Sequence, residues 1–133
     1  MSQRFSTDVL IIGGGAAGLA AALHLADSAR VTVLAKGEPA SGSSFWAQGG
    51  IAAVLDDADC FAFHEADSVK AGADLCDLET VRLMVREAPD VVRELSKWGV
   101  DFDKENNQLH LTVEGGHSHR RVAHVADATG REI

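Results

Sequence analysis

The sequence is poor in three features that would each define a class of protein: cysteines, basic residues and long apolar runs. Its two cysteines, Cys60 and Cys76, lack CxxC spacing and are too few for a disulfide framework, so we expect both to be reduced packing residues. Lysine and arginine number 12 against 20 aspartates and glutamates, and the resulting net charge of −8 argues against nucleic acid as a partner. No apolar run approaches the roughly 18 residues of a membrane span. Residues 1–8 lack the charged-then-apolar order of a signal peptide, so the simplest expectation is a cytoplasmic protein that does not enter the membrane.

A strand, a helix and a second strand follow one another closely at the start of the chain. Thr7–Ile12 is short, β-branched and apolar and is closed by glycines, which predicts a buried strand. Ala16–Ala26 is rich in alanine and leucine and predicts a helix, and Val31–Leu34 predicts a second buried strand. Because one helix joins them, the two strands should form a parallel pair with a right-handed crossover. We therefore predict an α/β fold of the Rossmann type.

A helical segment is expected further along the chain. After a loop at 37–50, Ile51–Leu55 predicts either a short strand or the first turn of a helix. Cys60–Ala71 predicts a helix with Asp59 as its N-cap. Apolar residues then follow helical spacing up to Trp98.

Three residues are expected to set the limits and shape of that second helix. Asp77 is suited to the N-cap and Gly99 to the C-terminal cap. Pro89 should either kink the helix or begin a new one.

The last part of the chain predicts a β-hairpin. Leu109–Val113 alternates like a strand, Gly115 and Gly116 form a turn, and Arg121–Val125 is suited to the return strand. Ala128–Ile133 looks like the beginning of another element.

The glycine-rich segment after the first strand fits the dinucleotide-binding pattern GxGxxG. Gly13 permits the tight turn, Gly15 lets the backbone approach a pyrophosphate, and Gly18 lets the helix pack closely on the strand. The helix N-terminus then offers N–H groups and a positive dipole end to the phosphates. The flanking strands and helix supply the context that this pattern requires, so a turn without a ligand is the weaker interpretation.

Lys36 bears on which dinucleotide is bound. An NAD site places Asp or Glu at the end of the second strand to bind the ribose, and this sequence has Lys36 there. The lysine argues against ordinary NAD binding. Two interpretations stay open: contact with a phosphate or ribose of another nucleotide, or a solvated surface lysine.

Three segments resemble one family closely. Asp8–Leu19 is similar to the opening of the succinate dehydrogenase and fumarate reductase flavoprotein superfamily, and Ala47–Ala53 to its second FAD loop. Glu114–Arg121 resembles one branch of that family, the L-aspartate oxidases. The resemblance implies that residues 1–133 are the N-terminal portion of an FAD-binding domain, with the capping domain and the C-terminal helical domain lying outside it.

The resemblance also implies an activity. L-aspartate oxidases convert L-aspartate to iminoaspartate, pass the electrons to oxygen or fumarate, and feed quinolinate and hence NAD synthesis, which links them functionally to quinolinate synthase. The arginine that serves as general acid or base falls beyond Ile133 in the family pattern, so we expect the isolated chain to be inactive. Two alternatives stay open: a nucleotide-binding module without catalysis, or part of a succinate dehydrogenase or fumarate reductase flavoprotein.

The resemblance carries FAD contacts onto individual residues. Ser43 stands where the respiratory enzymes have a histidine that bonds covalently to the flavin, so non-covalent FAD is expected. Phe45 and Trp46 have two open interpretations, flavin contact or core packing. The expected FAD-binding residues are Gly13, Gly14, Gly15, Ala16, Ala17, Gly18, Lys36, Ser43, Ser44, Phe45, Trp46, Ala47, Gln48, Gly49 and Gly50.

Glu114 is the candidate for substrate recognition. In the aspartate oxidases this glutamate orients the substrate, and a carboxylate is a charge-assisted partner for the α-ammonium that distinguishes aspartate from succinate. The alternative is a solvated glutamate before a glycine turn, without a functional role. His117 and His119 could suggest a metal, but neighbouring arginines disfavour a cation and no third ligand is evident. We expect no metal and favour a role for both histidines near the substrate carboxylates.

Overall fold

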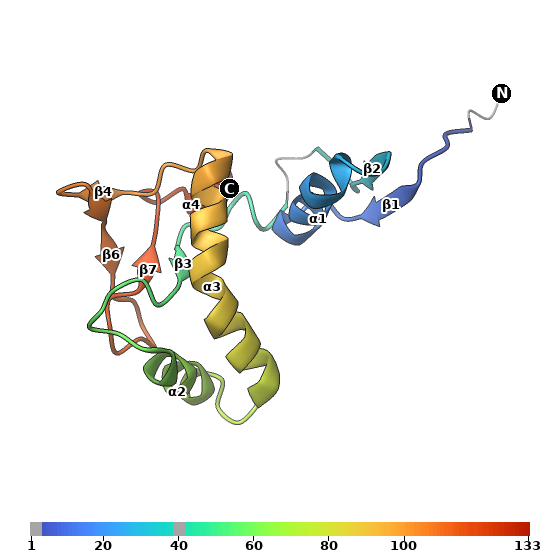
Figure 1. The fold of residues 1–133 in the computed structure, drawn as a ribbon. Coiled ribbons are helices and arrows are strands. Elements are labelled where there is room, and N and C mark those ends of the chain that lie inside the picture. Colours follow the sequence, from blue (N-terminus) through green and yellow to red (C-terminus); the bar gives the residue numbers. More distant parts are fainter. Residues whose placement is uncertain (1–3, 39–41) are drawn as a thin grey trace. The chain divides into compact units, whose positions relative to one another are not determined.

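The chain forms two compact units, Met1–Ala47 and Gln48–Ile133, shown as a ribbon in Figure 1. This computed structural model describes residues 4–38 and 42–133. Residues 39–41 of the expected loop and the first three residues lie outside the described part. Each unit is described by itself.

The first unit is the expected strand–helix–strand. Strand β1 (Val9–Ile12), helix α1 (Ala16–Ala26) and strand β2 (Val31–Leu34) follow in order, and the two strands pair in parallel with Val9 opposite Val31. The α/β fold class and the parallel pair are therefore confirmed. Strand β1 starts two residues later than expected, after Thr7, whose hydroxyl donates to the Arg30 carbonyl at 2.6 Å.

The expectation that both strands are buried is wrong. Leu10, Ile12 and Leu34 are 53%, 82% and 55% exposed, whereas Val9 and Ile11 are half-buried. A two-stranded sheet packed on one helix buries only one of its faces. The apolar residues of both strands predicted a sheet that is covered on both faces. In this unit only one face is covered, by α1.

The second unit contains two helices, α2 (Phe61–Ala71) and α3 (Leu78–Trp98). Both expected caps of α3 are confirmed: Asp77 Oδ1 accepts from the Thr80 N–H at 2.8 Å, and Gly99 ends the helix with φ +112°. Helix α3 continues through the buried Pro89 as one element, so the interpretation of Pro89 as the start of a new helix is wrong.

The expected N-cap of α2 is also wrong. Cys60 occupies the cap position and its side chain makes no capping bond. Asp59 instead accepts from the Cys60 N–H at 2.8 Å and turns its carboxylate to Arg121. A buried guanidinium competes more strongly for a carboxylate than a helix N–H does. Both cysteines are free thiols, as expected.

A small antiparallel sheet faces α3 in the second unit. Its strands β3 (Ile51–Ala52), β7 (Val122–Ala123) and β6 (Leu111–Thr112) lie in that order. The expected hairpin is confirmed in β6 and β7, and Ile51–Leu55 contributes a strand and not a helical turn. The short helix α4 (Thr129–Glu132) is the element expected at the end of the sequence.

The sequence did not predict a second hairpin. The expected strand Leu109–Val113 is divided: Leu109 belongs to β5 (Gln108–Leu109), which pairs with β4 (Lys104–Glu105), and only Leu111 and Thr112 form β6. The turn residues Asn106 and Asn107 have φ of +51° and +68°. Asparagine tolerates this left-handed conformation, which suits two-residue hairpins.

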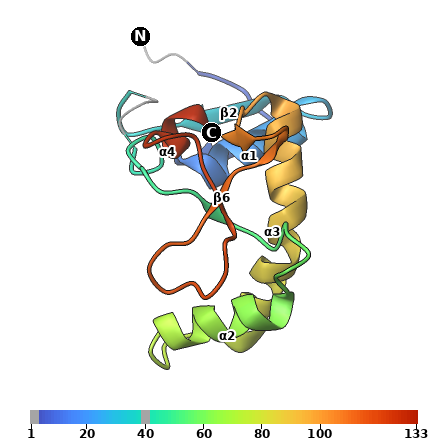
Figure 2. The same cartoon turned by 90° about the vertical axis from the view of Figure 1, so that its left-hand side faces the viewer.

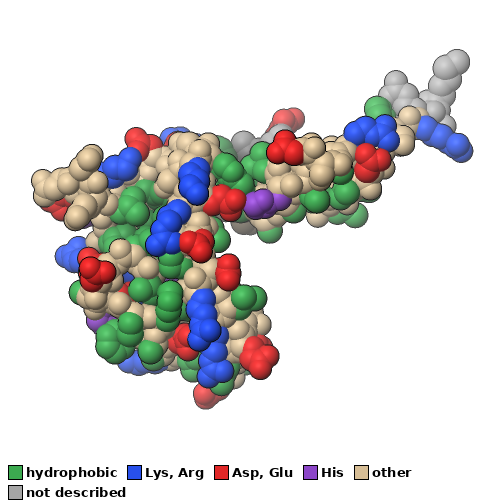
Figure 3. Space-filling view, in the orientation of Figure 1, with side chains coloured by type: hydrophobic (Ala, Val, Ile, Leu, Met, Phe, Trp, Pro, Cys, Tyr) green, Lys and Arg blue, Asp and Glu red, His purple; other side chains and the backbone are tan. Residues whose placement is uncertain are grey.

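The core of the second unit lies between α3 and the sheet. It consists of the buried side chains of Ala53, Val92, Leu95, Phe102 and Ala123. On the face shown in Figure 3, basic and acidic side chains are interspersed over this unit and form no patch of one sign. Within the described residues, no helix combines the length and apolar character needed to cross a membrane.

Candidate functional site

The glycine turn between β1 and α1 is tightly constrained. Gly13 has φ +119°, and its N–H donates to the Leu34 carbonyl at 2.9 Å, which ties the turn to β2. A Cβ on Gly18 would lie 2.1 Å from the Gly13 carbonyl oxygen, so α1 can pack this closely only with glycine there. The turn and the packing have the form that the sequence predicted for a dinucleotide site.

The N-terminus of α1 is suited to an anion. Gly15 is its N-cap and offers no side chain, and the first turn contains no acidic residue. The Ala16 N–H donates to the Ser44 hydroxyl at 3.1 Å, so a residue of the loop expected at 37–50 lies directly at the helix end. N–H donors and the positive dipole end fit a pyrophosphate, so the donor set is compatible with FAD.

Lys36 follows the end of β2 beside the same turn. A Cβ on Gly14 would lie 3.4 Å from Ala35 Cβ, which brings the strand end against the turn. Lys36 itself is exposed. This position is compatible with contact to a nucleotide phosphate or ribose and equally with a solvated surface lysine.

Ser43–Ala47 closes the first unit as a turn. The rings of Phe45 and Trp46 meet edge to face, with centroids 5.2 Å apart. Trp46 is 71% exposed, which argues against core packing within this unit, whereas Phe45 is half-buried. Ser43 is exposed at the start of the turn.

The remaining residues of that predicted loop, Gln48–Gly50, belong to the second unit. A Cβ on Gly50 would lie 2.2 Å from the Ala123 carbonyl oxygen and 2.6 Å from Val122 Cγ1. Gly50 therefore has a packing role against β7. A Cβ on Gly49 would lie 3.7 Å from Glu114 Oε2, so the loop comes close to the candidate substrate carboxylate.

Glu114 lines an open hollow of about 400 Å³ in the second unit. The other lining residues are Gln48, Gly49, Thr112, His124, Ala126 and Asp127. Glu114 is exposed, and its carbonyl accepts from the His117 N–H at 3.1 Å across a turn in which Gly116 has φ +89°. The structure thus brings Glu114 together with Gln48 and Gly49, two of the predicted flavin-side residues.

Arg121 fixes the loop that carries Glu114. We call residues 113–121, between β6 and β7, the site loop; Figure 2 shows it reaching toward α2. The Arg121 side chain is fully buried and bonds both oxygens of Asp59, at 2.7 and 2.8 Å, and Asp67 Oδ2 at 2.7 Å. Its partners lie 62 and 54 positions away in the sequence, so charge patterning alone could not reveal them.

The buried network keeps both carboxylates ionised. Hydrogen bonds from Ser118, followed by those from Arg121, hold the pKa of Asp67 well below its usual value. Burial acts to raise the pKa of Asp59, but the hydrogen bonds from Arg121 outweigh it and the pKa is lowered. Burial, assisted by the Arg121 charge, lowers the pKa of His64, which is therefore neutral near pH 7.

His117 and His119 lie in the site loop and not on a strand. His117 Nδ1 lies 3.3 Å from Arg121 Nη1, and the His119 ring stacks on Phe63 with centroids 4.8 Å apart. No cluster of potential metal ligands occurs in residues 4–38 and 42–133.

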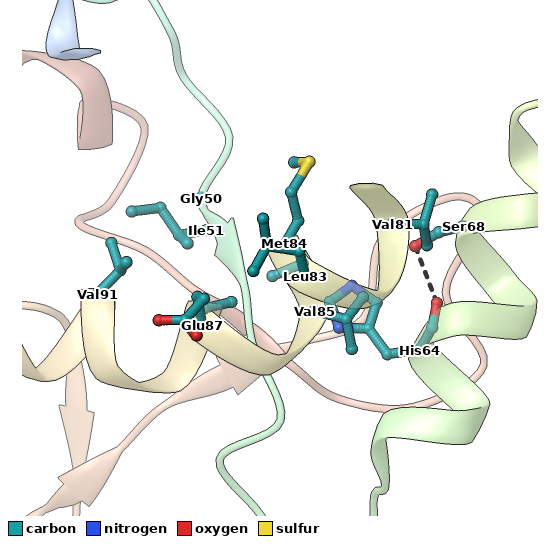
Figure 4. A pocket seen from close by; sticks show the side chains of 12 residues that line it. Gly50, Ile51, His64, Ser68, Val81, Leu83, Met84, Val85, Glu87 and Val91 are labelled. Carbon is teal, nitrogen blue, oxygen red and sulfur yellow. Dashed lines mark hydrogen bonds between the residues drawn. The ribbon is translucent and has the colours of Figure 1, made fainter. Parts of the chain in front are cut away.

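A larger hollow of about 680 Å³ lies between α2, α3 and β3 (Figure 4). Its lining is mostly aliphatic, with Met84 and Val91 from α3 and Ile51 from β3. The Ser68 hydroxyl in its wall donates to the His64 carbonyl at 2.8 Å. An aliphatic lining offers packing surface but few groups for chemistry, so this hollow is not the candidate site.

The glycine turn and the anion-binding helix end of the first unit define a dinucleotide-binding module. The sequence pattern of the FAD binding domain family matches residues 8–133, and the chain belongs to that family. The expected cofactor, FAD, is thereby confirmed.

Curated relatives narrow the resemblance. The chain is 49% identical to an L-aspartate oxidase of Pseudomonas aeruginosa, over 100% of this chain and 26% of the relative. It is 51% identical to an L-aspartate oxidase of Yersinia pestis, over 99% of this chain and 26% of the relative. A chloroplastic L-aspartate oxidase of Arabidopsis thaliana is 49% identical over 95% of this chain and 20% of the relative. The chain thus spans about a quarter of the length of the bacterial relatives, and the suspected resemblance to the aspartate oxidases is confirmed.

Solved structures confirm the fold. The Sdh1 complex of Mycobacterium smegmatis matches with a TM-score of 0.90 and 34% identity, over 98% of this chain and 23% of that one. A quinol fumarate reductase of E. coli matches with a TM-score of 0.91 and 32% identity, over the same shares. The chain therefore has the fold of the matching part of the succinate dehydrogenase and fumarate reductase flavoproteins.

Proposed function

We propose that this chain is the FAD-binding part of an L-aspartate oxidase, which converts L-aspartate to iminoaspartate. The observation that carries the proposal is Glu114, whose carboxylate lines a hollow shared with Gln48 and Gly49 of the predicted flavin loop. The identity of about 50% to enzymes of that name supports it.

The first unit would hold much of the dinucleotide. The turn at Gly13–Gly18 and the N–H groups of α1 would bind the pyrophosphate, and Lys36 would contact the nucleotide half. Ser43–Gly50 would contact the flavin side, and because Ser43 cannot supply the covalent bond, FAD would be held non-covalently. Bound FAD supplies the acceptor for the hydride that leaves the substrate carbon.

Glu114 would select an amino acid over a plain dicarboxylate. Its carboxylate pairs with the substrate α-ammonium, and Asp127 in the same hollow adds negative charge. The general acid or base lies beyond residue 133 in the family pattern, so the activity belongs to a longer polypeptide.

The wider role follows from the product. Oxygen or fumarate would accept the electrons, and iminoaspartate would feed quinolinate in de novo NAD synthesis. A cytoplasmic enzyme of this kind would work together with quinolinate synthase.

A respiratory succinate or fumarate flavoprotein is the second candidate, favoured by TM-scores of 0.90 and 0.91. Ser43 and Glu114 both weigh against it, because the resemblance gives those enzymes a flavin-linking histidine and a neutral residue at the two positions. A nucleotide-binding module without catalysis is the third.

The test is a Glu114→Gln substitution in the full-length flavoprotein. Loss of a charge-assisted hydrogen bond should raise KM for L-aspartate by about tenfold to a hundredfold. The affinity for succinate, which lacks the ammonium, should change little. Steady-state kinetics with succinate as competitive inhibitor measure both quantities.

Glu105→Gln, at an exposed glutamate of β4, is the matched control and should leave KM unchanged. If Glu114→Gln weakened the binding of L-aspartate and of succinate equally, the proposed role of Glu114 would be contradicted. A full-length protein that retains FAD but never oxidises L-aspartate would favour the non-catalytic module.

A further inference from the structure

His64 is a buried titratable side chain that the proposed chemistry does not use. It belongs to α2 and is 6% exposed, and Figure 4 shows its ring reaching from that helix toward Val85 of α3. Its Nδ1 has no hydrogen-bond partner among the described residues. An unpaired nitrogen is costly in a buried neutral ring, and the cost increases greatly when the ring carries a charge. The position therefore favours the neutral imidazole.

Charged and titratable groups face this ring from its neighbours. They are Arg121 and His117 of the site loop, Asp59 before α2, Asp67 within α2, and Glu87 of α3, which lines the same hollow as His64. Strand β3, which also borders the hollow, carries no titratable side chain. Burial and then the Arg121 charge oppose a proton on the ring more strongly than the two aspartates favour it, so the pKa of His64 is lowered.

The site loop packs on α2 beside this ring. The His117 ring meets the His64 ring edge to face, with centroids 5.7 Å apart. Asp67 holds the loop there, because its Oδ2 accepts from the Ser118 N–H and the Ser118 hydroxyl, each at 2.7 Å. The closed loop thus keeps the imidazole of His64 and the guanidinium of Arg121 in one buried cluster.

We propose that His64 is a pH-sensitive switch for the site loop: the loop stays closed on α2 while the ring is neutral and opens when the ring takes up a proton. Opening hydrates the imidazolium and separates it from the Arg121 guanidinium. This inference goes beyond the proposed function, because it concerns the loop whatever ligand binds. Glu114 belongs to the same loop, so acid should also weaken the binding of L-aspartate, and that consequence rests on the proposed function.

The direction of the pH effect follows from the lowered pKa. A histidine whose pKa is lower in the closed loop than in the open one stabilises the closed loop above the open value of about 6.5. That contribution is lost as pH falls below about 6.5, until the closed-state pKa is reached. Since one proton is taken up on opening, the opening equilibrium should increase by up to about tenfold per pH unit in that range.

Hydrogen exchange of the full-length flavoprotein measures the opening directly. The amides of His117, Ser118 and Arg121 are all hydrogen-bonded in the closed loop. In peptides spanning 113–121, exchange corrected for intrinsic rates should report about fivefold to tenfold more opening at pH 5.5 than at pH 7.5. Peptides from α3 should show no such change. A pH-independent loop in the unsubstituted protein, or an equal change in α3, would overturn the proposal.

Two substitutions at the switch remove the titrating group. His64→Leu and His64→Gln should both abolish the acid-induced opening, since neither side chain takes up a proton in this range. His24→Gln, at an exposed histidine of α1, is the matched control and should retain it. If the opening persists in the His64 variants, His64 is not the switch.

Kinetics separate this inference from the proposed function. KM for L-aspartate should rise between pH 7.5 and pH 5.5 in the unsubstituted protein more than in His64→Gln. Loop opening that depends on His64 but leaves L-aspartate unaffected would support the switch and count against the proposed role of Glu114. Oxidation of L-aspartate by a protein whose loop exchange does not depend on His64 would retain the proposed function and refute the switch.

Discussion

Arg121 has no exposed surface, yet it carries a full charge inside the second unit. Bonds to both oxygens of Asp59 and one of Asp67 offset the cost of burying that charge, and together they attach the site loop to α2. Replacement of either aspartate would leave the guanidinium less compensated. The conformation of the site loop therefore depends on two carboxylates from distant parts of the sequence.

The lowered pKa of Asp67 gives a pH-dependent stability with a definite sign. A carboxyl whose pKa falls on folding stabilises the protein above its unfolded pKa of about 4, and that contribution is lost as pH falls through the lower folded value. Asp67→Asn should therefore destabilise the second unit at pH 7 but reduce its loss of stability between pH 4 and pH 2. Urea titrations across this range measure the effect.

Asp57→Asn, at an exposed aspartate before α2, is the control for that series. It should preserve the acid-induced loss seen in the unsubstituted protein. If Asp67→Asn loses as much stability as the unsubstituted protein between pH 4 and pH 2, protonation of Asp67 does not cause the acid-induced loss.

Gly18 offers a residue-level test of the cofactor site. A Cβ 2.1 Å from the Gly13 carbonyl would force the turn and α1 apart, so Gly18→Ala in the full-length protein should reduce bound flavin from stoichiometric to a trace. The ratio of flavin to protein absorbance measures this. Gly42→Ala, where a Cβ meets no atom within 4 Å, should retain the flavin. If both variants retained all of their flavin, the close packing of α1 at Gly18 would be unnecessary for flavin binding.

At the level of elements, α3 is bounded by two caps that the sequence identified. Asp77→Ala should destabilise the second unit by about 1 kcal/mol, because the Thr80 N–H loses its acceptor. Asp77→Asn keeps a capping oxygen and should cost much less. Thermal and urea unfolding compare the two, and equal losses would mean that charge rather than capping is responsible.

The elements that the sequence predicted well are those determined locally. Helix α1 and strand β2 have the expected bounds because composition and flanking glycines act over a few residues. The split of Leu109–Val113 was missed because two left-handed asparagines, Asn106 and Asn107, reverse the chain before it. Asp59 was misassigned because its partner Arg121 is distant in sequence.

In the candidate site too, the sequence predicted the local pattern but not the contacts between distant segments. The glycine turn is a local pattern, and its geometry follows from three residue positions. The proximity of Glu114 to Gly49 and the attachment of the site loop to α2 depend on tertiary packing. No spacing rule in the sequence connects those segments.

For the whole molecule, activity should require more chain than residues 1–133. The isolated chain supplied with FAD should not consume oxygen or fumarate with L-aspartate, because the general acid or base expected from the family pattern lies outside it. An oxygen electrode and fumarate-dependent turnover test both acceptors, with the full-length protein as the positive control. Measurable turnover by the isolated chain would place the proton acceptor within these residues.

The contact of Gly50 with β7 would couple cofactor occupancy to folding under the proposed function. With no side chain between Gly50 and the Ala123 carbonyl, a ligand lying along Gln48–Gly50 that binds only the folded chain stabilises the sheet beneath it by mass action. The Ala53 amide, bonded to the Arg121 carbonyl at 2.9 Å, reports on the opening of that sheet through its hydrogen exchange. Under that coupling, flavin supply would be a determinant of the protein's lifetime, since chains without cofactor would open more often and be exposed to proteolysis.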